Sequence, residues 1–178
     1  MKASIYFYSM DTERSLYEIE VALAKSDEFN FVRNIVAFNV NGWGNNPYIG
    51  HECDMLILSK SGYLTEIEIK RSLSDFLADF KKKHYHESEI IKYFYYCVPE
   101  SIYDKVCDEL SKRCVSYSGI ITFDEDLNIR NLGYDKNGHV REIYPNRKLF
   151  LEEQLQVARF GAMRSVLLKE KIIKLEKS

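Results

Sequence analysis

Three features of the sequence predict an α/β domain. Segments with the two-residue alternation of β-strands are separated by segments with helical spacing of apolar residues. A strand, a tight turn, a second strand and a helix follow one another without interruption between residues 51 and 83. The length of 178 residues, with 46% hydrophobic residues and only 3 prolines, suits one ordered domain. We therefore expect a sheet with helices packed against it.

The stretch from residue 51 to residue 83, HECDMLILSKSGYLTEIEIKRSLSDFLADFKKK, organises the rest of the chain. Asp54 stands at the start of an apolar strand, and a turn rich in serine and glycine leads into the next strand. Side chains alternate along that second strand, so Glu66, Glu68 and Lys70 share one face. Buried carboxylates without partners are costly or become protonated, so three charges on a central strand need an explanation.

A metal site is one explanation of these charges. Carboxylates on adjacent strands can hold a divalent ion, and a lysine beside them offsets part of their charge. Such an ion polarises a phosphoryl oxygen and lowers the pKa of bound water, while the lysine orients that water or stabilises developing charge. Asp54, Glu68 and Lys70 therefore fit phosphodiester hydrolysis. The alternative is an ion-paired amphipathic hairpin with its charged face in water, because Glu-x-Lys is common by chance.

The complete string resembles the core of the PD-(D/E)XK nuclease superfamily, with Asp54 as the first acid and Glu68-Ile69-Lys70 as the (D/E)XK motif. More narrowly, EIEIKRSLSDFLADFKKKH followed by YFYYCVP resembles the branch with MmcB-type bacterial DNA-repair proteins and related phage proteins. The resemblance implies a restriction-endonuclease-like α-β-β-β-α-β core, in which helices flank a central mixed sheet. It also implies cleavage of nucleic acid with Mg²⁺ or Mn²⁺. Cys53 stands where the superfamily name has proline.

The resemblance assigns roles to particular residues. Asp54 and Glu68 are the implied metal ligands together with the backbone carbonyl of Ile69, and Lys70 positions the attacking water. Many members carry a glutamate on the first core helix that reaches the metal. Glu20 is the candidate here, at the edge of the apolar stripe of a helix expected from residue 11 or 12 to about residue 26. An acid so placed is also typical of the rim of a core. The substitutes for it are Glu13 and Glu18.

Nucleic-acid contacts are expected beside the motif. The loop of residues 41–50 carries Trp43 and Tyr48, aromatic residues that either stack on bases or pack the loop down. A run of lysines ends the motif helix, where it suits the helix dipole and can also contact phosphates. The remaining candidates are Arg71 and Ser72, which follow the motif, and the lysines Lys81, Lys82 and Lys83. Ser72 is also the expected N-cap of the helix, paired with Asp75 as in a capping box.

Composition excludes several classes of function. With 25 Lys and Arg against 27 Asp and Glu, the net charge of −2 argues against nucleic-acid binding through overall charge, so affinity must come from local patches or metal. The four cysteines lack CxxC spacing, which predicts reduced structural thiols and argues against zinc. No apolar run approaches the length of a membrane span and no signal-peptide pattern precedes the domain. We expect a cytoplasmic protein without a membrane partner.

The chain is expected to form a single domain over residues 1–178. Its core spans about residues 11–125, and a C-terminal hairpin and long helix occupy residues 126–178, with the helix from about residue 147 to residue 175 either continuous or broken at Gly161. The sequence Asp-Lys-Asn-Gly at residues 135–138 is typical of a turn and predicts the hairpin. The residues predicted to form the apolar core of the motif are Leu56, Leu58, Ile67, Ile69, Phe76 and Phe80.

Three interpretations compete at this point. The first is a metal-dependent nuclease, acting on DNA in preference to RNA in a repair, phage or mobile-element context, alone or with a homodimeric or other protein partner. The second is a non-catalytic nucleic-acid-binding or structural subunit that retains the nuclease fold. The third is an unrelated α/β protein with a fortuitous amphipathic hairpin, which leaves the charged face and the capped helix unexplained.

Overall fold

The computed structural model describes residues 14–41, 51–82, 88–115, 118–133 and 147–177. Trp43, Tyr48, Lys83 and the expected turn at residues 135–138 lie outside these segments. The elements, in chain order, are α1 (Leu16–Lys25), β1 (Ile35–Asn41), β2 (Glu52–Leu58), β3 (Leu64–Ile69), α2 (Leu73–Asp79), β4 (Ile91–Pro99), the short 3₁₀ helix η1 (Glu100–Ile102), α3 (Tyr103–Lys112), β5 (Ser118–Phe123), β6 (Ile129–Gly133) and α4 (Leu151–Glu176).

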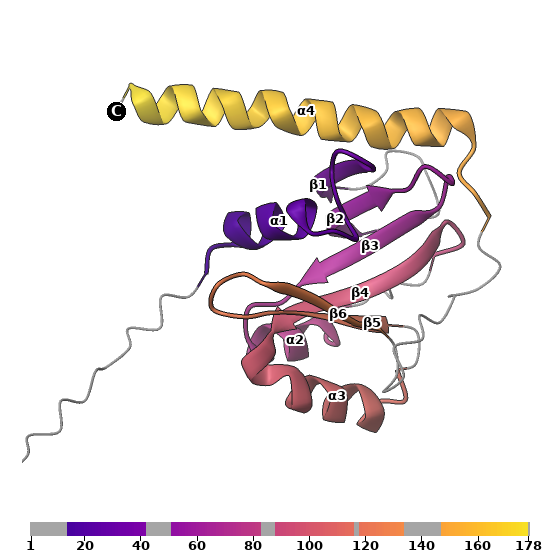
Figure 1. Ribbon diagram of the computed structural model, residues 1–178, viewed down its shortest axis with the longest axis vertical. Coiled ribbons are helices and arrows are strands. Elements are labelled where there is room, and N and C mark those ends of the chain that lie inside the picture. Colours follow the sequence, from indigo (N-terminus) through magenta and orange to yellow (C-terminus); the bar gives the residue numbers. More distant parts are fainter. Residues whose placement is uncertain (1–13, 42–50, 83–87, 116–117, 134–146, 178) are drawn as a thin grey trace, which may run out of the picture.

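One six-stranded mixed sheet runs through the molecule in the order β1-β2-β3-β4-β5-β6 (Figure 1). The first three strands are antiparallel neighbours, and Gly62, at a φ of 86°, lies in the turn that joins β2 to β3. Strands β3, β4 and β5 are parallel, with α2 and α3 in the connections, and β6 returns antiparallel to β5. The predicted α/β class is confirmed. From α1 to β4 the elements follow the order α-β-β-β-α-β.

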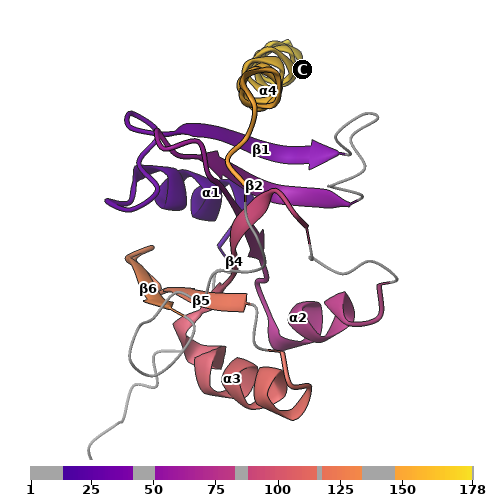
Figure 2. The same ribbon diagram turned by 90° about the vertical axis from the view of Figure 1, so that its right-hand side faces the viewer.

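Helices cover both faces of the sheet (Figure 2). Helix α1 packs on one face through Ile19 and Leu23, both fully buried. Helices α2 and α3 pack on the other face through Phe76 and Val106, also fully buried. The predicted core residues that are buried are Leu56, Leu58, Ile67, Ile69 and Phe76. Phe80 is only half-buried, because α2 ends at Asp79 and Phe80 is its C-cap.

Helix α1 begins later than expected, after Ser15 rather than at residue 11 or 12. The Ser15 hydroxyl accepts the Glu18 N–H at 3.3 Å, and the Glu18 carboxylate accepts the Ser15 N–H at 2.9 Å. This capping box satisfies two backbone donors at the helix start. Glu18 is therefore exposed and engaged in the cap, whereas Glu20 turns inward and is buried.

Helix α4 is continuous through Gly161. Figures 1 and 2 show it alongside β1, on the side away from β2. A Cβ atom at Gly161 would lie 2.8 Å from the Val36 carbonyl oxygen, so the glycine permits a close approach of helix and strand. Gly161 therefore marks a contact rather than a break. Of the helices in the described segments, none is long and apolar enough to cross a membrane.

Candidate metal and catalytic site

The sheet opens between β2 and β3 at one end. Pairing between these strands extends only as far as Met55 and Ile67, although β2 begins at Glu52 and β3 continues to Ile69. The start of β2 stays paired with β1, and the end of β3 stays paired with β4. The Asp54 side chain spans the opening, because its Oδ2 accepts the Ile69 N–H at 2.8 Å.

Asp54 is half-buried at this opening. Burial raises the pKa of its carboxyl to about 7, and the nearby charge of Glu68 adds to the rise. The Ile69 N–H and the charges of Lys70 and Lys82 act in the opposite direction. The two predicted acids are thus close enough to repel each other, and a proton or a cation relieves that repulsion.

Glu68 is buried, and only one of its two carboxylate oxygens accepts a hydrogen bond from the described residues. Its Oε1 accepts Lys70 Nζ at 2.7 Å and lies 3.5 Å from Lys82 Nζ. Its Oε2 is buried and has no hydrogen-bond partner among the described residues. An ionised carboxylate oxygen can only accept, so a buried one without a donor suits a bound cation.

Lys70 is the buried cation of the site. Its Nζ donates to Glu68 at 2.7 Å and to Asp79 Oδ1 at 2.9 Å. Burial acts to lower the pKa of Lys70, but the charges and hydrogen bonds of the two carboxylates outweigh burial and raise it. Lys70 therefore stays an ammonium group. It can donate hydrogen bonds and stabilise negative charge, and it cannot serve as a base near neutral pH.

Asp79 and Tyr96 were not predicted as site residues. Asp79 is buried, and its Oδ1 accepts both Lys70 and Lys82, the latter at 2.7 Å. Its Oδ2 accepts the Tyr96 hydroxyl at 3.0 Å. Asp79 follows Phe76 by three residues, so it falls on the apolar face of α2. An acid on that face was the signal in the sequence that could have identified it.

Lys82 was predicted as a nucleic-acid contact, and the structure places it beside the acids. Its side chain is 43% exposed and bridges Glu68 and Asp79. Burial acts to lower the pKa of Lys82, and the hydrogen bond to Asp79 together with the charges of both acids raises it. Lys82 is thus the more accessible of the two cations that neutralise the buried acids.

Among the described residues, no hydrogen bond joins Glu20 to Asp54. Its Oε1 accepts Asn39 Nδ2 at 2.6 Å. Burial raises the pKa of Glu20, while the Asn39 hydrogen bond and the charge of Arg164 act to lower it. Its role as a metal ligand stays a prediction.

Asn39 joins Glu20 to β1, the neighbour of the strand that carries Asp54. Asn39 lies opposite Asp54 in the β1–β2 register, between the pairs Phe38–Met55 and Val40–Cys53. Its φ of 49° is in the left-handed region, which asparagine tolerates better than most residues. The strand therefore departs from regular geometry where the site begins, which no pattern in the sequence indicated.

The remaining predicted contacts lie around α2. Ser72 caps the helix, as its hydroxyl accepts the Asp75 N–H at 3.2 Å. The Asp75 carboxylate accepts the Arg71 N–H instead of the expected Ser72 N–H. Arg71 and Lys81 are exposed. Nucleic-acid binding by these residues, and metal binding by the Ile69 carbonyl, stay predictions.

The site residues fit the Mg²⁺ or Mn²⁺ that the resemblance implies. Asp54 is reachable from solvent, and Glu68 has a buried oxygen without a donor. These hard oxygen ligands are the type that both ions prefer. Within the described segments, however, the group of three side chains with mutually close ligand atoms is a different one, namely His51, Cys53 and Glu66.

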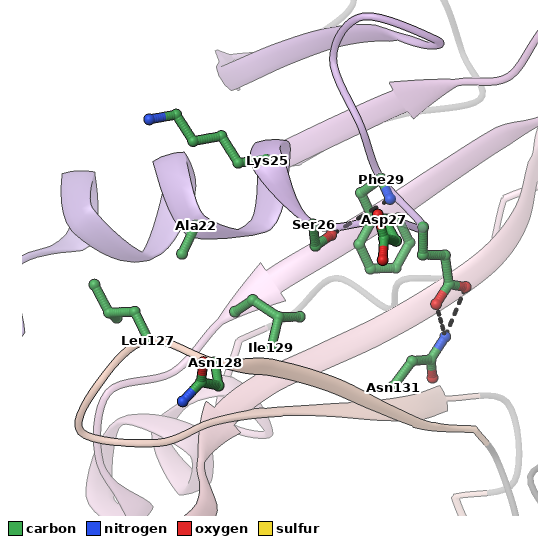
Figure 3. Close-up of a pocket in the computed structure, with 10 residues that line it drawn as sticks. Ala22, Lys25, Ser26, Asp27, Phe29, Leu127, Asn128, Ile129 and Asn131 are labelled. Carbon is green, nitrogen blue, oxygen red and sulfur yellow. Dashed lines mark hydrogen bonds between the residues drawn. The ribbon is translucent and has the colours of Figure 1, made fainter.

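One large cavity lies apart from the candidate site. A cavity of about 540 Å³ lies between the end of α1 and the turn before β6 (Figure 3). At its rim Asn131 donates to both carboxylate oxygens of Glu28 at 2.7 Å. Its lining consists of Ala22, Lys25, Ser26, Asp27, Glu28, Phe29, Leu127, Asn128, Ile129 and Asn131. None of the predicted site residues lines it.

No protein-family model and no curated protein matches this sequence. A solved structure with a similar fold is the SPO1766 protein of unknown function from Silicibacter pomeroyi. The TM-score is 0.53 at 16% sequence identity, over 90% of this chain and 91% of that chain. At this identity the likeness concerns the fold alone. It extends along nearly the whole chain and says nothing about activity.

Proposed function

We propose that the protein is a metal-dependent nuclease of the PD-(D/E)XK type that hydrolyses phosphodiester bonds, with DNA as the preferred substrate. The opening between β2 and β3 carries the proposal, because Asp54 and Glu68 interact across it and Lys70 lies beside them. The α-β-β-β-α-β order of elements supports the same superfamily. The repair, phage or mobile-element context rests on the sequence resemblance.

Each residue has a physical role in this proposal. Asp54 and Glu68 would hold Mg²⁺ or Mn²⁺, which supplies Lewis acidity and lowers the pKa of a bound water. Lys70, held as an ammonium group, would orient the attacking water and stabilise negative charge on the phosphoryl group. Asp79 and Tyr96 would fix the position of Lys70, since Asp79 accepts from both.

Substrate binding must be local under this proposal, because the net charge of the chain is −2. The exposed Arg71 and Lys81 flank α2, with Arg71 just before the helix and Lys81 just after it, and they are the residues that would contact a phosphate backbone near the site. Such contacts position a nucleic acid and carry no sequence information. We therefore expect cleavage with little sequence preference and strong dependence on salt.

A non-catalytic nucleic-acid-binding or structural subunit is the second candidate. The ion-pair network favours it, because two lysines already neutralise the two buried acids Glu68 and Asp79. The charges of such a network balance without a metal ion, although Glu68 Oε2 has no hydrogen-bond partner among the described residues. In that case the acids and lysines hold α2 against the sheet and perform no chemistry.

Cleavage assays test the proposal directly. The purified protein is incubated with single-stranded, duplex and branched DNA and with RNA, in Mg²⁺, in Mn²⁺ and in chelator. We expect cleavage only with metal, and its loss in Asp54→Asn and Glu68→Gln. The matched control is Glu170→Gln, at an exposed position of α4. Cleavage in chelator, or undiminished cleavage in Asp54→Asn, would contradict the mechanism, and binding without any cleavage would favour the second candidate.

A further inference from the structure

A cluster of three different potential metal ligands lies beside the candidate site. His51 Nε2 lies 2.6 Å from Glu66 Oε1, and Cys53 Sγ lies 3.6 Å from the same His51 nitrogen. The three ligand atoms are all within 4.8 Å of one another. The side chains of His51 and Glu66 are 3% and 0% exposed, and Cys53 is fully buried.

These residues are separate from the acids assigned to the nuclease chemistry. His51 immediately precedes β2, Cys53 lies near its start, and Glu66 comes from the middle of β3. Glu66 shares a face of β3 with Glu68 but contacts His51 rather than Lys70. The ligands lie far apart in the sequence, with His51 just before β2, Cys53 in β2 and Glu66 in β3, so a search for CxxC spacing does not reveal them.

We propose that His51, Cys53 and Glu66 form a second metal site, which binds a borderline transition-metal ion such as Zn²⁺. An imidazole nitrogen, a thiolate and a carboxylate are the ligands that zinc takes in proteins. Mg²⁺ and Mn²⁺ prefer sites made of oxygen, so the thiolate directs this site away from the ions proposed for Asp54 and Glu68. The inference does not rest on the nuclease activity.

The geometry is close to that of a tetrahedral zinc site. With Zn–N bonds of about 2.0 Å and Zn–S bonds of about 2.3 Å, the nitrogen and sulfur ligands lie about 3.5 Å apart. The separation of Cys53 Sγ and His51 Nε2 is 3.6 Å. The Glu66 oxygen must withdraw by about 0.7 Å, because a metal ion replaces the short contact between His51 and Glu66. Water completes the four ligands, and the thiol proton of Cys53 passes to solvent on binding.

The position of the site suggests what the ion does. Backbone pairing between β2 and β3 ends at Met55 and Ile67, and Cys53 lies beyond that point. An ion held by Cys53 and Glu66 would therefore tie the two strands together beside the opening. Asp54 is adjacent to Cys53 in β2, so the ion would also fix the backbone that carries the first acid of the candidate site. The burial of all three ligands keeps the ion out of reach of a nucleic-acid substrate.

Cobalt provides a direct test, because Co²⁺ occupies zinc sites and a thiolate ligand gives it an intense charge-transfer band in the near ultraviolet. The full chain should carry Cys114→Ser, which removes the exposed thiol. We expect the band to appear with one equivalent of Co²⁺ and to vanish when Zn²⁺ is added. It should be absent in the additional variant Cys53→Ser and present in the control Cys107→Ser, whose thiol is only half-buried on α3.

Stability gives a second readout on the same proteins. Zn²⁺ should raise the unfolding midpoint of the chain with Cys53 intact, by the linkage of binding to folding, and should leave that of His51→Gln unchanged. Absence of a thiolate band in the folded chain with Cys53 intact would overturn the proposal, whatever the variants do. A band that persists in Cys53→Ser would overturn it as well. In those cases His51 and Glu66 form a hydrogen-bonded pair beside a thiol, and the nuclease proposal is unaffected.

Discussion

The Asp54 carboxylate accepts the backbone N–H of Ile69 at 2.8 Å, at the point where β2 and β3 cease to pair. The Asp54 side chain thus accepts a hydrogen bond from a backbone N–H of β3 that has no partner on β2. A buried N–H group without an acceptor would be costly. The bond fixes one carboxylate oxygen of Asp54. The other makes no hydrogen bond to the described residues and is open to solvent or to an ion.

The raised pKa of Asp54 predicts how stability depends on pH. Its pKa of about 7 in the folded chain exceeds the ordinary value of about 3.9, so between these values the folded state holds a proton that the unfolded state has lost. The stabilising contribution is therefore complete below about pH 4 and is lost as pH rises through about 7. Urea unfolding in chelator should show wild type losing stability over this range relative to Asp54→Asn.

Metal binding should follow the opposite trend. An ion needs the ionised Asp54, so Mn²⁺ affinity should increase as pH rises through about 7 and reach a plateau above it. With saturating Mn²⁺ the loss of stability at higher pH should disappear in wild type. Parallel pH profiles for wild type and Asp54→Asn in chelator would show that Asp54 does not titrate in this range.

Replacement of Lys70 should separate catalysis from binding. If Lys70 stabilises charge that develops in the transition state, Lys70→Met should lower the cleavage rate at least about a hundredfold and change DNA affinity by less than about threefold. Rates from single-turnover assays and affinities from fluorescence anisotropy give the two numbers. The control is Lys60→Met, at an exposed turn position. Because Lys70 is buried and ion-paired, circular dichroism must first show that the variant is folded.

Lys82 should compete with the metal ion for Glu68. Its Nζ lies 3.5 Å from Glu68 Oε1 and the side chain is 43% exposed, so a divalent ion can displace it. Loss of its charge in Lys82→Met should tighten Mn²⁺ binding by up to about fivefold, the range expected for a partly exposed ion pair. Lys81→Met removes the same charge from the neighbouring exposed position and is the matched control. Calorimetry that finds equal or weaker binding in Lys82→Met would exclude this competition.

The core beneath α2 provides a test of packing. Phe76 is fully buried, with its ring centroid 5.2 Å from that of Phe80 and 5.0 Å from that of Tyr96. Phe76→Ala should lower the free energy of unfolding by about 3–5 kcal/mol. Phe80→Ala should cost less because Phe80 is half-buried, and Phe150→Ala, at a residue 62% exposed, should cost less than about 0.5 kcal/mol. Equal losses at positions 76 and 80 would be inconsistent with this burial.

Local patterns predicted much of the fold. The alternation in β3 placed Glu66, Glu68 and Lys70 on one face and the isoleucines on the other, and all of these residues are buried as the pattern requires of a sheet covered on both sides. The predicted start of α1 was wrong, although the sequence contains the capping signal for the correct start. Ser15 is followed three residues later by Glu18, a capping box that residues 11 and 12 lack.

Contacts between distant segments could not be predicted in the same way. Asp79 reaches Lys70 from a helix, and Glu66 meets His51 across two strands, so both contacts depend on how elements pack. Burial of Phe80 depended on where α2 ends, which apolar spacing does not specify. The sequence likewise shows a glycine at position 161 but not the strand that requires it.

Gly161 has a consequence for how the protein behaves at high concentration. Strand β1 is an edge of the sheet, and the unpaired backbone groups of an edge strand can recruit strands from other molecules. Helix α4 lies along this edge, and a side chain at Gly161 would meet the Val36 carbonyl oxygen and push the helix away. Gly161→Val should therefore cause aggregation, visible by light scattering, whereas Ala162→Val at the adjacent exposed position should not. We therefore expect that the single hydrogen at position 161, in place of a side chain, keeps copies of this protein from joining along the β1 edge.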